Sequence, residues 1–269
     1  MASDPMASDP TVSDPMASDP IASDPMISVS IPATRRRPGC ALVTGSSSGI
    51  GAQVTRQLLA QGWRVIGLDR AAATIDDDAF ESIECDLSDP PAVATWLSQQ
   101  REVDCWVHAA GFMHTAALGA LCSTESSAMW RVHVVAAELL ANQLLPAMAA
   151  RGYGRAVLVG SRVAAGFPGR SQYAASKAAL VSLARSWASE TVRRGVTVNV
   201  VSPAATDTPM LDCQARASSR PLSPPMGRLI TASEVASLIA YLVSDSAAAI
   251  TGQELVICGG SSLPGVTAS

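Results

Sequence analysis

Tyr173 and Lys177 stand four positions apart, and their side-chain types at that spacing could carry out proton transfer. On a helix, residues i and i+4 lie on the same face, so a phenol and an ammonium can act on one reacting atom. A tyrosine pKa is normally about 10, and a cation one turn away lowers it by stabilising the phenolate. Lys177 is the single lysine of the chain, which otherwise uses arginine. Because Tyr-x-x-x-Lys also arises by chance on exposed helices, the neighbouring elements must support this interpretation.

A glycine-rich turn lies between a predicted strand and a predicted helix near the start of the fold. The apolar run that begins at Cys40 is typical of a buried parallel strand, and residues 50–59 have the apolar periodicity of a helix. Glycines at 45, 49 and 51 let the backbone turn tightly and approach a pyrophosphate, whose charge would rest on amides at the helix N-terminus. This spacing is a variant of the dinucleotide-binding fingerprint.

Asp69 closes the next predicted strand, residues 64–68, about twenty residues beyond the glycines. A carboxylate at that point can accept hydrogen bonds from the adenosine ribose and repel a 2′-phosphate, which favours NAD over NADP. Arg70 follows directly and could instead bind a 2′-phosphate, whereas the turn itself offers serines and no basic residue. NAD is therefore the favoured cofactor, and NADP remains open.

The rest of the chain alternates predicted strands and helices with short links. One strand ends at residue 85, others cover 104–108, 155–159, 197–201 and 254–257, and helices cover 92–100, 123–148, 172–194 and 233–243. This alternation predicts an α/β fold, a Rossmann-type doubly wound parallel sheet of seven strands, with the cofactor across the carboxyl ends of the strands. Residues 204–227 hold several prolines and little periodicity, so we expect a loop that closes over the site.

Composition places limits on the kind of protein. Residues 1–25 repeat a pentad ending in Ser-Asp-Pro and offer no apolar face, so residues 1–37 are predicted to be a disordered tail, 38–263 one domain, and 264–269 a short C-terminal tail. With a net charge of −4 and few clustered basic residues, nothing indicates nucleic acid or a membrane as partner. The six cysteines lack a C-x-x-C pair, and we expect no metal site and a cytoplasmic location.

Several of these features occur in a fixed order: the turn at residues 44–51, Asp69, Asp86-Leu87, Ala109-Ala110-Gly111, Ser161, Tyr173 with Lys177, and the turn at residues 203–208. Over about residues 38–263, the chain thereby resembles the single-domain, classical type of short-chain dehydrogenase/reductase. The resemblance implies hydride transfer between a nicotinamide ring and a carbonyl or secondary alcohol carbon.

The resemblance also implies roles for individual residues. Tyr173 would exchange the proton, Ser161 would hydrogen-bond the substrate oxygen, and Lys177 would bind the nicotinamide ribose and lower the pKa of Tyr173. Donors already aimed at an oxygen that changes charge are what such a reaction requires. The predicted cofactor-binding residues are Gly45, Ser47, Ser48, Gly49, Ile50, Gly51, Asp69, Arg70, Asp86, Leu87, Ala109, Ala110, Gly111, Tyr173, Lys177, Pro203, Thr206 and Thr208.

Several features of the sequence depart from the family pattern. His133 stands where relatives usually have an asparagine that supports a helix kink, whose backbone carbonyl holds a water linked to the lysine. We therefore expect an altered proton relay rather than lost activity, and His133 is a candidate catalytic residue as well as a candidate structural one. Ala109 replaces a common asparagine, and the Ser161 to Tyr173 interval is one residue shorter than in many relatives.

The leading hypothesis is an NAD-dependent dehydrogenase that interconverts a small or mid-sized secondary alcohol and its ketone. The alternatives are an NADPH-dependent 3-oxoacyl-type ketoreductase and a non-catalytic, cofactor-binding regulator. Arg162 and Arg170 flank the substrate side and could pair with a carboxylate or sulfonate, or else lie on the surface or in a subunit contact. The resemblance also implies a homo-oligomer, a tetramer or a dimer, paired through the two long helices and through the last helix and strand.

Overall fold

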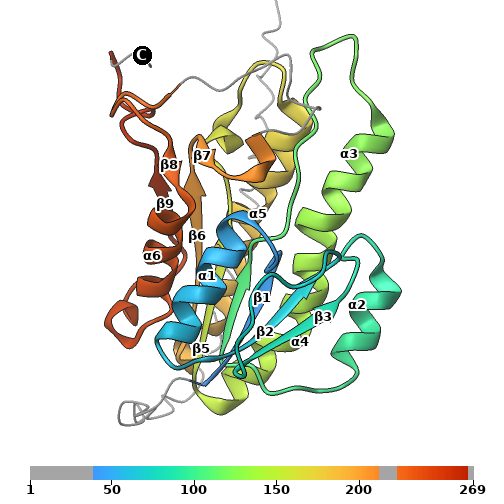
Figure 1. Cartoon of the computed structure of the whole chain (residues 1–269), viewed down its shortest axis with the longest axis vertical. Helices are drawn as coiled ribbons and strands as arrows, with labels where there is room; N and C mark the ends of the chain where they lie inside the picture. Colours follow the sequence, from blue (N-terminus) through green and yellow to red (C-terminus); the bar gives the residue numbers. More distant parts are fainter. Residues whose placement is uncertain (1–38, 212–222, 266–269) are drawn as a thin grey trace, which may run out of the picture. The chain divides into compact units, whose positions relative to one another are not determined.

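Seven parallel strands form the central sheet of the computed structural model, which describes residues 39–211 and 223–265 (Figure 1). The strands lie in the order β3-β2-β1-β4-β5-β6-β9. Their bounds are β1 Cys40–Thr44, β2 Arg64–Asp69, β3 Phe80–Glu84, β4 Cys105–His108, β5 Gly154–Val159, β6 Val196–Pro203 and β9 Glu254–Ile257. The chain moves outward from β1 to β3 and then returns to β4, so the strand order reverses between β1 and β4. The predicted doubly wound sheet of seven strands is confirmed.

Helices cover both faces of this sheet (Figure 1). α1 (Gly49–Ala60) and α6 (Ala232–Leu242) pack on one face, and α2 (Pro90–Leu97), α4 (Ala136–Arg151) and α5 (Ser171–Thr191) pack on the other. In β1, Leu42 faces the second group of helices, and Ala41 and Val43 face the first. Because both faces are covered, central strands are almost continuously apolar, and all eight residues of β6 are buried.

The predicted helix of residues 123–148 is not continuous. α3 (Ser123–Trp130) passes into a π-helical segment, η1 (Arg131–Val135), before α4 begins. By length and a mean hydropathy of 1.3, the whole stretch Ser123–Arg151 could cross a membrane, but 56% of its most apolar window is buried inside the fold. It is accordingly a core helix of this domain, interrupted by a π-helical segment, a feature common at functional sites.

Other predicted boundaries also need correction. The helix predicted at residues 92–100 is α2, which ends at Leu97, and Gln100 beyond it has a positive φ of 49°. The predicted loop of residues 204–227 contains β7 (Thr206–Asp207), which pairs with β8 (Ile230–Thr231), and a 3-10 turn, η4 (Pro209–Leu211). The predicted tail of residues 1–37, residues 212–222 of the predicted loop and residues 266–269 of the predicted C-terminal tail lie outside the described residues.

Candidate active site

A cavity of about 910 Å³ opens at the carboxyl ends of the strands. Gly45 follows β1, Asp69 ends β2, Ala109 follows β4, Ser161 follows β5 and Pro203 ends β6, and all five line it. The cavity therefore spans the point where the strand order reverses, as the sequence predicted for the cofactor.

The glycine turn is built so that only glycine fits at two of its positions. Gly45 has φ +71°, and a Cβ there would lie 2.8 Å from the backbone of Ala110. A Cβ on Gly51 would lie 2.0 Å from the carbonyl oxygen of Gly45. The N-cap residue of α1, Ser48, makes no side-chain capping bond, so amides at this helix end remain available to an anionic ligand. The turn thus fits the pyrophosphate of a dinucleotide.

Asp69 lines the cavity at the far side of this turn. Its Oδ2 accepts a hydrogen bond from the Ser47 amide (3.0 Å), and its Oδ1 accepts one from the Ala71 amide (2.9 Å). Arg70 lines the same part of the cavity. Ser47 does not line it: its hydroxyl donates to the Ala71 carbonyl oxygen at 2.9 Å and thereby holds the turn against the segment after β2.

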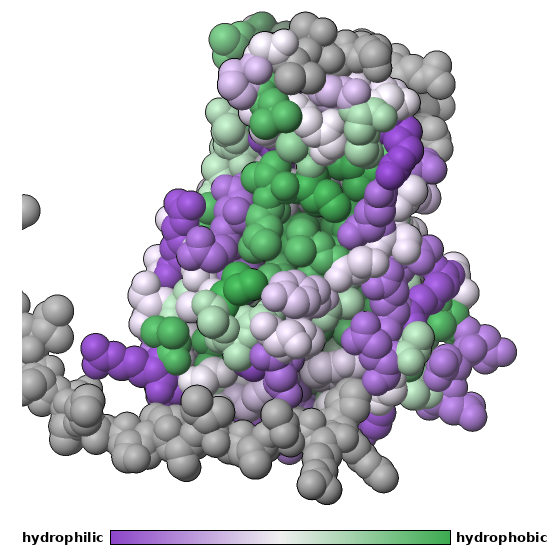
Figure 2. Space-filling model, turned by 90° about the vertical axis from the view of Figure 1, so that its left-hand side faces the viewer, coloured by the Kyte–Doolittle hydropathy of each residue, from purple (hydrophilic) through white to green (hydrophobic). Residues whose placement is uncertain are grey.

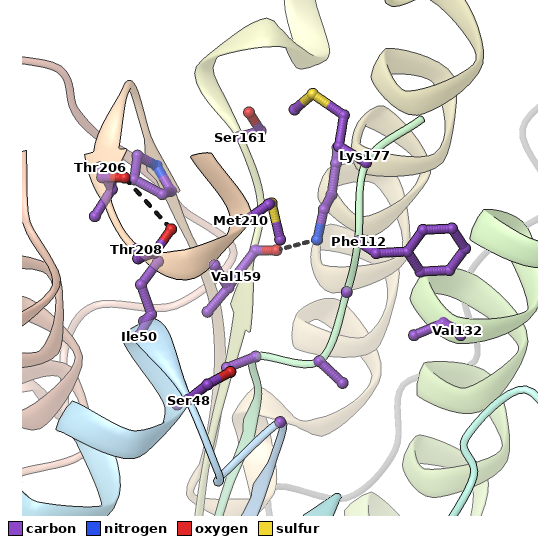
Figure 3. Close-up of a pocket in the computed structure, with 18 of the residues that line it drawn as sticks. Ser48, Ile50, Phe112, Val132, Val159, Ser161, Lys177, Thr206, Thr208 and Met210 are labelled. Carbon is purple, nitrogen blue, oxygen red and sulfur yellow. Dashed lines mark hydrogen bonds between the residues drawn. The ribbon is translucent and has the colours of Figure 1, made fainter. Parts of the chain in front are cut away.

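Ser161, Tyr173 and Lys177 meet at the other end of the cavity, and all three are buried there. Tyr173 and Lys177 lie on successive turns of α5, and the Lys177 Nζ is 5.9 Å from the centre of the Tyr173 ring. The Lys177 Nζ donates to the carbonyl oxygen of Val159 at 2.8 Å (Figure 3). Burial lowers the pKa of Lys177 to about 7. The three side chains predicted from the sequence thus share one site.

His133 lies behind Tyr173 and does not line the cavity. Its Nε2 accepts a hydrogen bond from the Phe112 amide at 3.2 Å, so the proton of the neutral ring is on Nδ1. Nδ1 donates to the Ser176 hydroxyl at 2.8 Å, and that hydroxyl donates to the Tyr173 carbonyl oxygen at 2.8 Å. Burial lowers the pKa of His133 well below its usual value. The neutral ring therefore ties the loop after β4 to the catalytic helix.

A second buried histidine, His108 at the end of β4, was not singled out in the sequence. Its Nε2 donates to the carbonyl oxygen of Val132 in the π segment at 3.2 Å. Its Nδ1 therefore accepts from the Thr44 hydroxyl at 2.9 Å, and that hydroxyl oxygen accepts from the Ala110 amide at 3.2 Å. Burial lowers the pKa of His108 to about 3. Only its place before Ala-Ala-Gly could have drawn attention to it.

Apart from Ser47 and His133, the structure brings every predicted site residue to the cavity wall. The sequence did not predict several apolar residues of that wall, because neither their type nor their spacing is distinctive. These residues are Cys85, Phe112, Met113, Ala128, Val132, Val159 and Val163. Figure 3 shows Phe112 and Met210 near Lys177, and Ser48 and Ile50 beside the glycine turn. The described residues hold no cluster of three or more His, Cys, Asp or Glu side chains that could bind a metal.

Comparison with known proteins agrees with this geometry. Residues 45–262 match the family model described as Enoyl-(Acyl carrier protein) reductase. The 3-oxoacyl-[acyl-carrier-protein] reductase FabG of Escherichia coli (strain K12) is 35% identical over 82% of this chain and 96% of its own length. The 2-keto-3-deoxy-L-fuconate dehydrogenase of Xanthomonas campestris pv. campestris is 30% identical over 87% of this chain and 84% of its own length.

A solved structure titled short chain dehydrogenase/reductase family protein is 34% identical and superposes with a TM-score of 0.77. The superposition covers 83% of this chain and 97% of that protein. Sequence, fold and the placement of the predicted residues around one cavity therefore agree. The chain belongs to the short-chain dehydrogenase/reductase family of oxidoreductases, which use a nicotinamide cofactor.

Proposed function

We propose that this protein interconverts a secondary alcohol and its ketone by hydride transfer with NAD(H). The observation that carries the proposal is one cavity lined at one end by the glycine turn and Asp69, and at the other by Ser161, Tyr173 and Lys177. When bound, the dinucleotide supplies or accepts the hydride. The chain's own residues bind the dinucleotide, transfer the proton and stabilise the charge on the substrate oxygen.

Tyr173 carries the proton in this proposal. In the direction of reduction, its hydroxyl gives a proton to the carbonyl oxygen, and in oxidation its phenolate takes one from the alcohol. The Ser161 hydroxyl donates a hydrogen bond to the same oxygen and steadies its developing charge. Lys177, one helical turn from Tyr173, stabilises the phenolate and offers its ammonium to the ribose of the cofactor.

Replacement of Tyr173 by phenylalanine tests this role. Tyr173→Phe should lower the rate of NADH oxidation with a ketone panel about 10²-fold or more, because the proton donor is gone while the cavity wall remains. Equilibrium binding of NADH should change little. An unchanged rate would contradict the proton role, and a wild-type protein that binds NADH but turns over no ketone or alcohol would be a non-catalytic binder.

A second candidate is an NADPH-dependent 3-oxoacyl-type ketoreductase, favoured by the relatives named 3-oxoacyl reductase and by Arg70 in the cavity wall. Equilibrium binding of NADH and NADPH separates the two candidates. We expect NADH to bind at least about tenfold tighter, a difference of about 1.4 kcal/mol, and Asp69→Ala to remove that preference. Tighter binding of NADPH that Arg70→Ala abolishes would support the second candidate instead.

We also propose that the protein self-associates through the face formed by α6 and β9. β9 is an edge strand that pairs only with β6 among the described strands, so one side of its backbone is free to meet another chain. Figure 2 shows an apolar patch on this side of the molecule. Val256 of β9 is 47% exposed, and Tyr241 of α6 and Leu263 after β9 are exposed as well.

A further inference from the structure

The charged side chains of the cavity wall are unevenly distributed. Of its two carboxylates among the described residues, Asp69 ends β2 and Asp86 follows β3. Arg162 and Arg170 line the opposite end and belong to the elements that carry the catalytic groups. Arg162 directly follows Ser161, and Arg170 precedes Tyr173 by three residues. The substrate end of the cavity is therefore positively charged.

Arg162 has unused donor capacity. It begins the short 3-10 turn η2 (Arg162–Ala165), and its Nη1 donates to the carbonyl oxygen of Ser261 at 3.3 Å. Its Nε is buried and has no hydrogen-bond partner in the part of the chain that the structure describes. Within residues 39–211 and 223–265, no carboxylate forms an ion pair with it. A buried guanidinium N–H without an acceptor calls for a ligand that accepts one.

Arg170 approaches the same aromatic ring as Arg162. The Arg170 guanidinium carbon lies 4.7 Å from the centre of the Phe167 ring, and that of Arg162 lies 6.0 Å from it. The ring thus helps to fix both planar cations near one another. Arg170 is also the N-cap residue of α5, whose first turn holds no acidic side chain, so the helix dipole adds positive potential there.

Apolar side chains surround Tyr173 in the same part of the cavity. Met113 and Val163 are buried against Tyr173, and Met210 packs on this group and lines the cavity. A ligand that places its carbonyl at Tyr173 therefore meets apolar surface nearby and guanidinium donors at Arg162 and Arg170. Such surroundings suit a molecule with a short apolar body and an anionic head.

We propose that Arg162 and Arg170, together with Phe167, form an anion-binding subsite that holds a carboxylate of the substrate. The substrate is then an oxo acid or the corresponding hydroxy acid, with its carboxylate accepting hydrogen bonds from the guanidiniums. This inference rests on the proposed oxidoreductase function, because the reacting carbonyl is taken to lie at Tyr173. Since both arginines are attached next to catalytic residues, the subsite would fix the carboxylate relative to the reacting carbon.

Equilibrium binding tests the subsite without turnover. Calorimetry with 4-oxopentanoate, 5-oxohexanoate and their methyl esters, with and without NADH, compares an anionic and a neutral form of each ketone. We expect each acid to bind at least about tenfold tighter than its ester, and Arg162→Gln and Arg170→Gln each to reduce that preference about tenfold. Equal affinity for acid and ester in the wild type would overturn the proposal, whether or not the ketones turn over.

Steady-state kinetics adds a readout that loss of folding cannot imitate. The two variants should raise KM for the oxo acids about tenfold more than they raise KM for the esters. Arg193→Gln is the matched control, because this exposed arginine lies beyond the opposite end of α5 and its loss makes the same charge change. An equal loss for acids and esters in both variants would overturn the subsite. Selective carboxylate binding without any hydride transfer would support the subsite while contradicting the proposed oxidoreductase function.

Discussion

The ammonium of Lys177 is buried without a carboxylate to pair with. Its hydrogen-bond acceptor is the carbonyl oxygen of Val159, and no carboxylate of the described chain forms an ion pair with it. Burial of a charge with so little compensation favours the neutral amine, which is why its pKa falls to about 7. In the cofactor-free protein, Lys177 therefore changes charge near neutral pH.

This pKa makes folding stability depend on pH in a definite direction. Between the folded value of about 7 and the ordinary value of 10.5, the unfolded chain binds a proton at Lys177 that the folded chain does not. The free energy of unfolding should therefore rise with pH across this window, by up to about 1.4 kcal/mol per pH unit. Urea unfolding of the wild type and of Lys177→Met at pH 7, 8 and 9 measures it. The free energy of unfolding of the wild type should rise relative to that of the variant as pH increases. If the two free energies change in parallel with pH, the lowered pKa of Lys177 is contradicted.

At the scale of elements, two neutral histidines brace the π segment. His108 donates a hydrogen bond from its Nε2 to the Val132 carbonyl oxygen, and His133 of the same segment bonds to Phe112 and Ser176. A π turn leaves backbone groups out of the regular helical register, and side chains must satisfy them. The π segment is thus held by β4 on one side and by α5 on the other.

Both histidines should make the protein sensitive to mild acid. In the folded protein, the pKa values of both histidines lie below the ordinary value of 6.5. As pH falls below 6.5, the unfolded chain therefore binds protons at these histidines that the folded chain does not bind. Each histidine should remove up to about 1.4 kcal/mol of unfolding free energy per pH unit. His133→Asn should reduce the slope between pH 6.5 and 5 by one proton. Denaturant unfolding at several pH values measures that slope, and an unchanged slope would show that His133 has the same pKa in the folded protein as in the unfolded chain.

The proximity of Tyr173 to Lys177 and the glycine turn could be predicted from the sequence because their signals are local. Tyr173 and Lys177 meet through helical spacing alone, and Gly45 is required by the backbone of its own turn. The π segment was missed because it is a shift of backbone hydrogen bonds within an unbroken apolar pattern. The partners of His133 were missed because they lie 21 and 43 residues away, where no periodicity connects them.

At the scale of the whole molecule, the sheet edge at β9 is the feature with the largest consequence. β9 leaves one side of its backbone without a described partner, and Val256, 47% exposed, stands on it. Proteins normally protect such an exposed edge strand with charged side chains or cover it with another chain. Figure 2 shows an apolar patch on this side of the molecule, bordered by hydrophilic residues.

Val256→Asp should therefore halve the size of the assembly, from tetramer to dimer or from dimer to monomer. A carboxylate at the centre of an apolar contact would have to be desolvated without a partner. Analytical ultracentrifugation measures the change, and Leu118→Asp, which alters a loop residue that is 87% exposed, is the control. An assembly of unchanged size in Val256→Asp would exclude this face as a subunit contact.

The burial of Lys177 also decides which chemical reagents can report on this protein. It is the single lysine of the sequence and only 4% exposed, so the surface presents no lysine to an amine-directed label. Cross-linkers that join two lysine amines would therefore not trap an assembly of this protein even when it forms. Cross-linkers that react with thiols or carboxylates have to be used instead. Conversely, a second labelled amine besides the chain's N-terminus would report opening of the cavity, and protection of that amine by a dinucleotide would give a direct signal of occupancy.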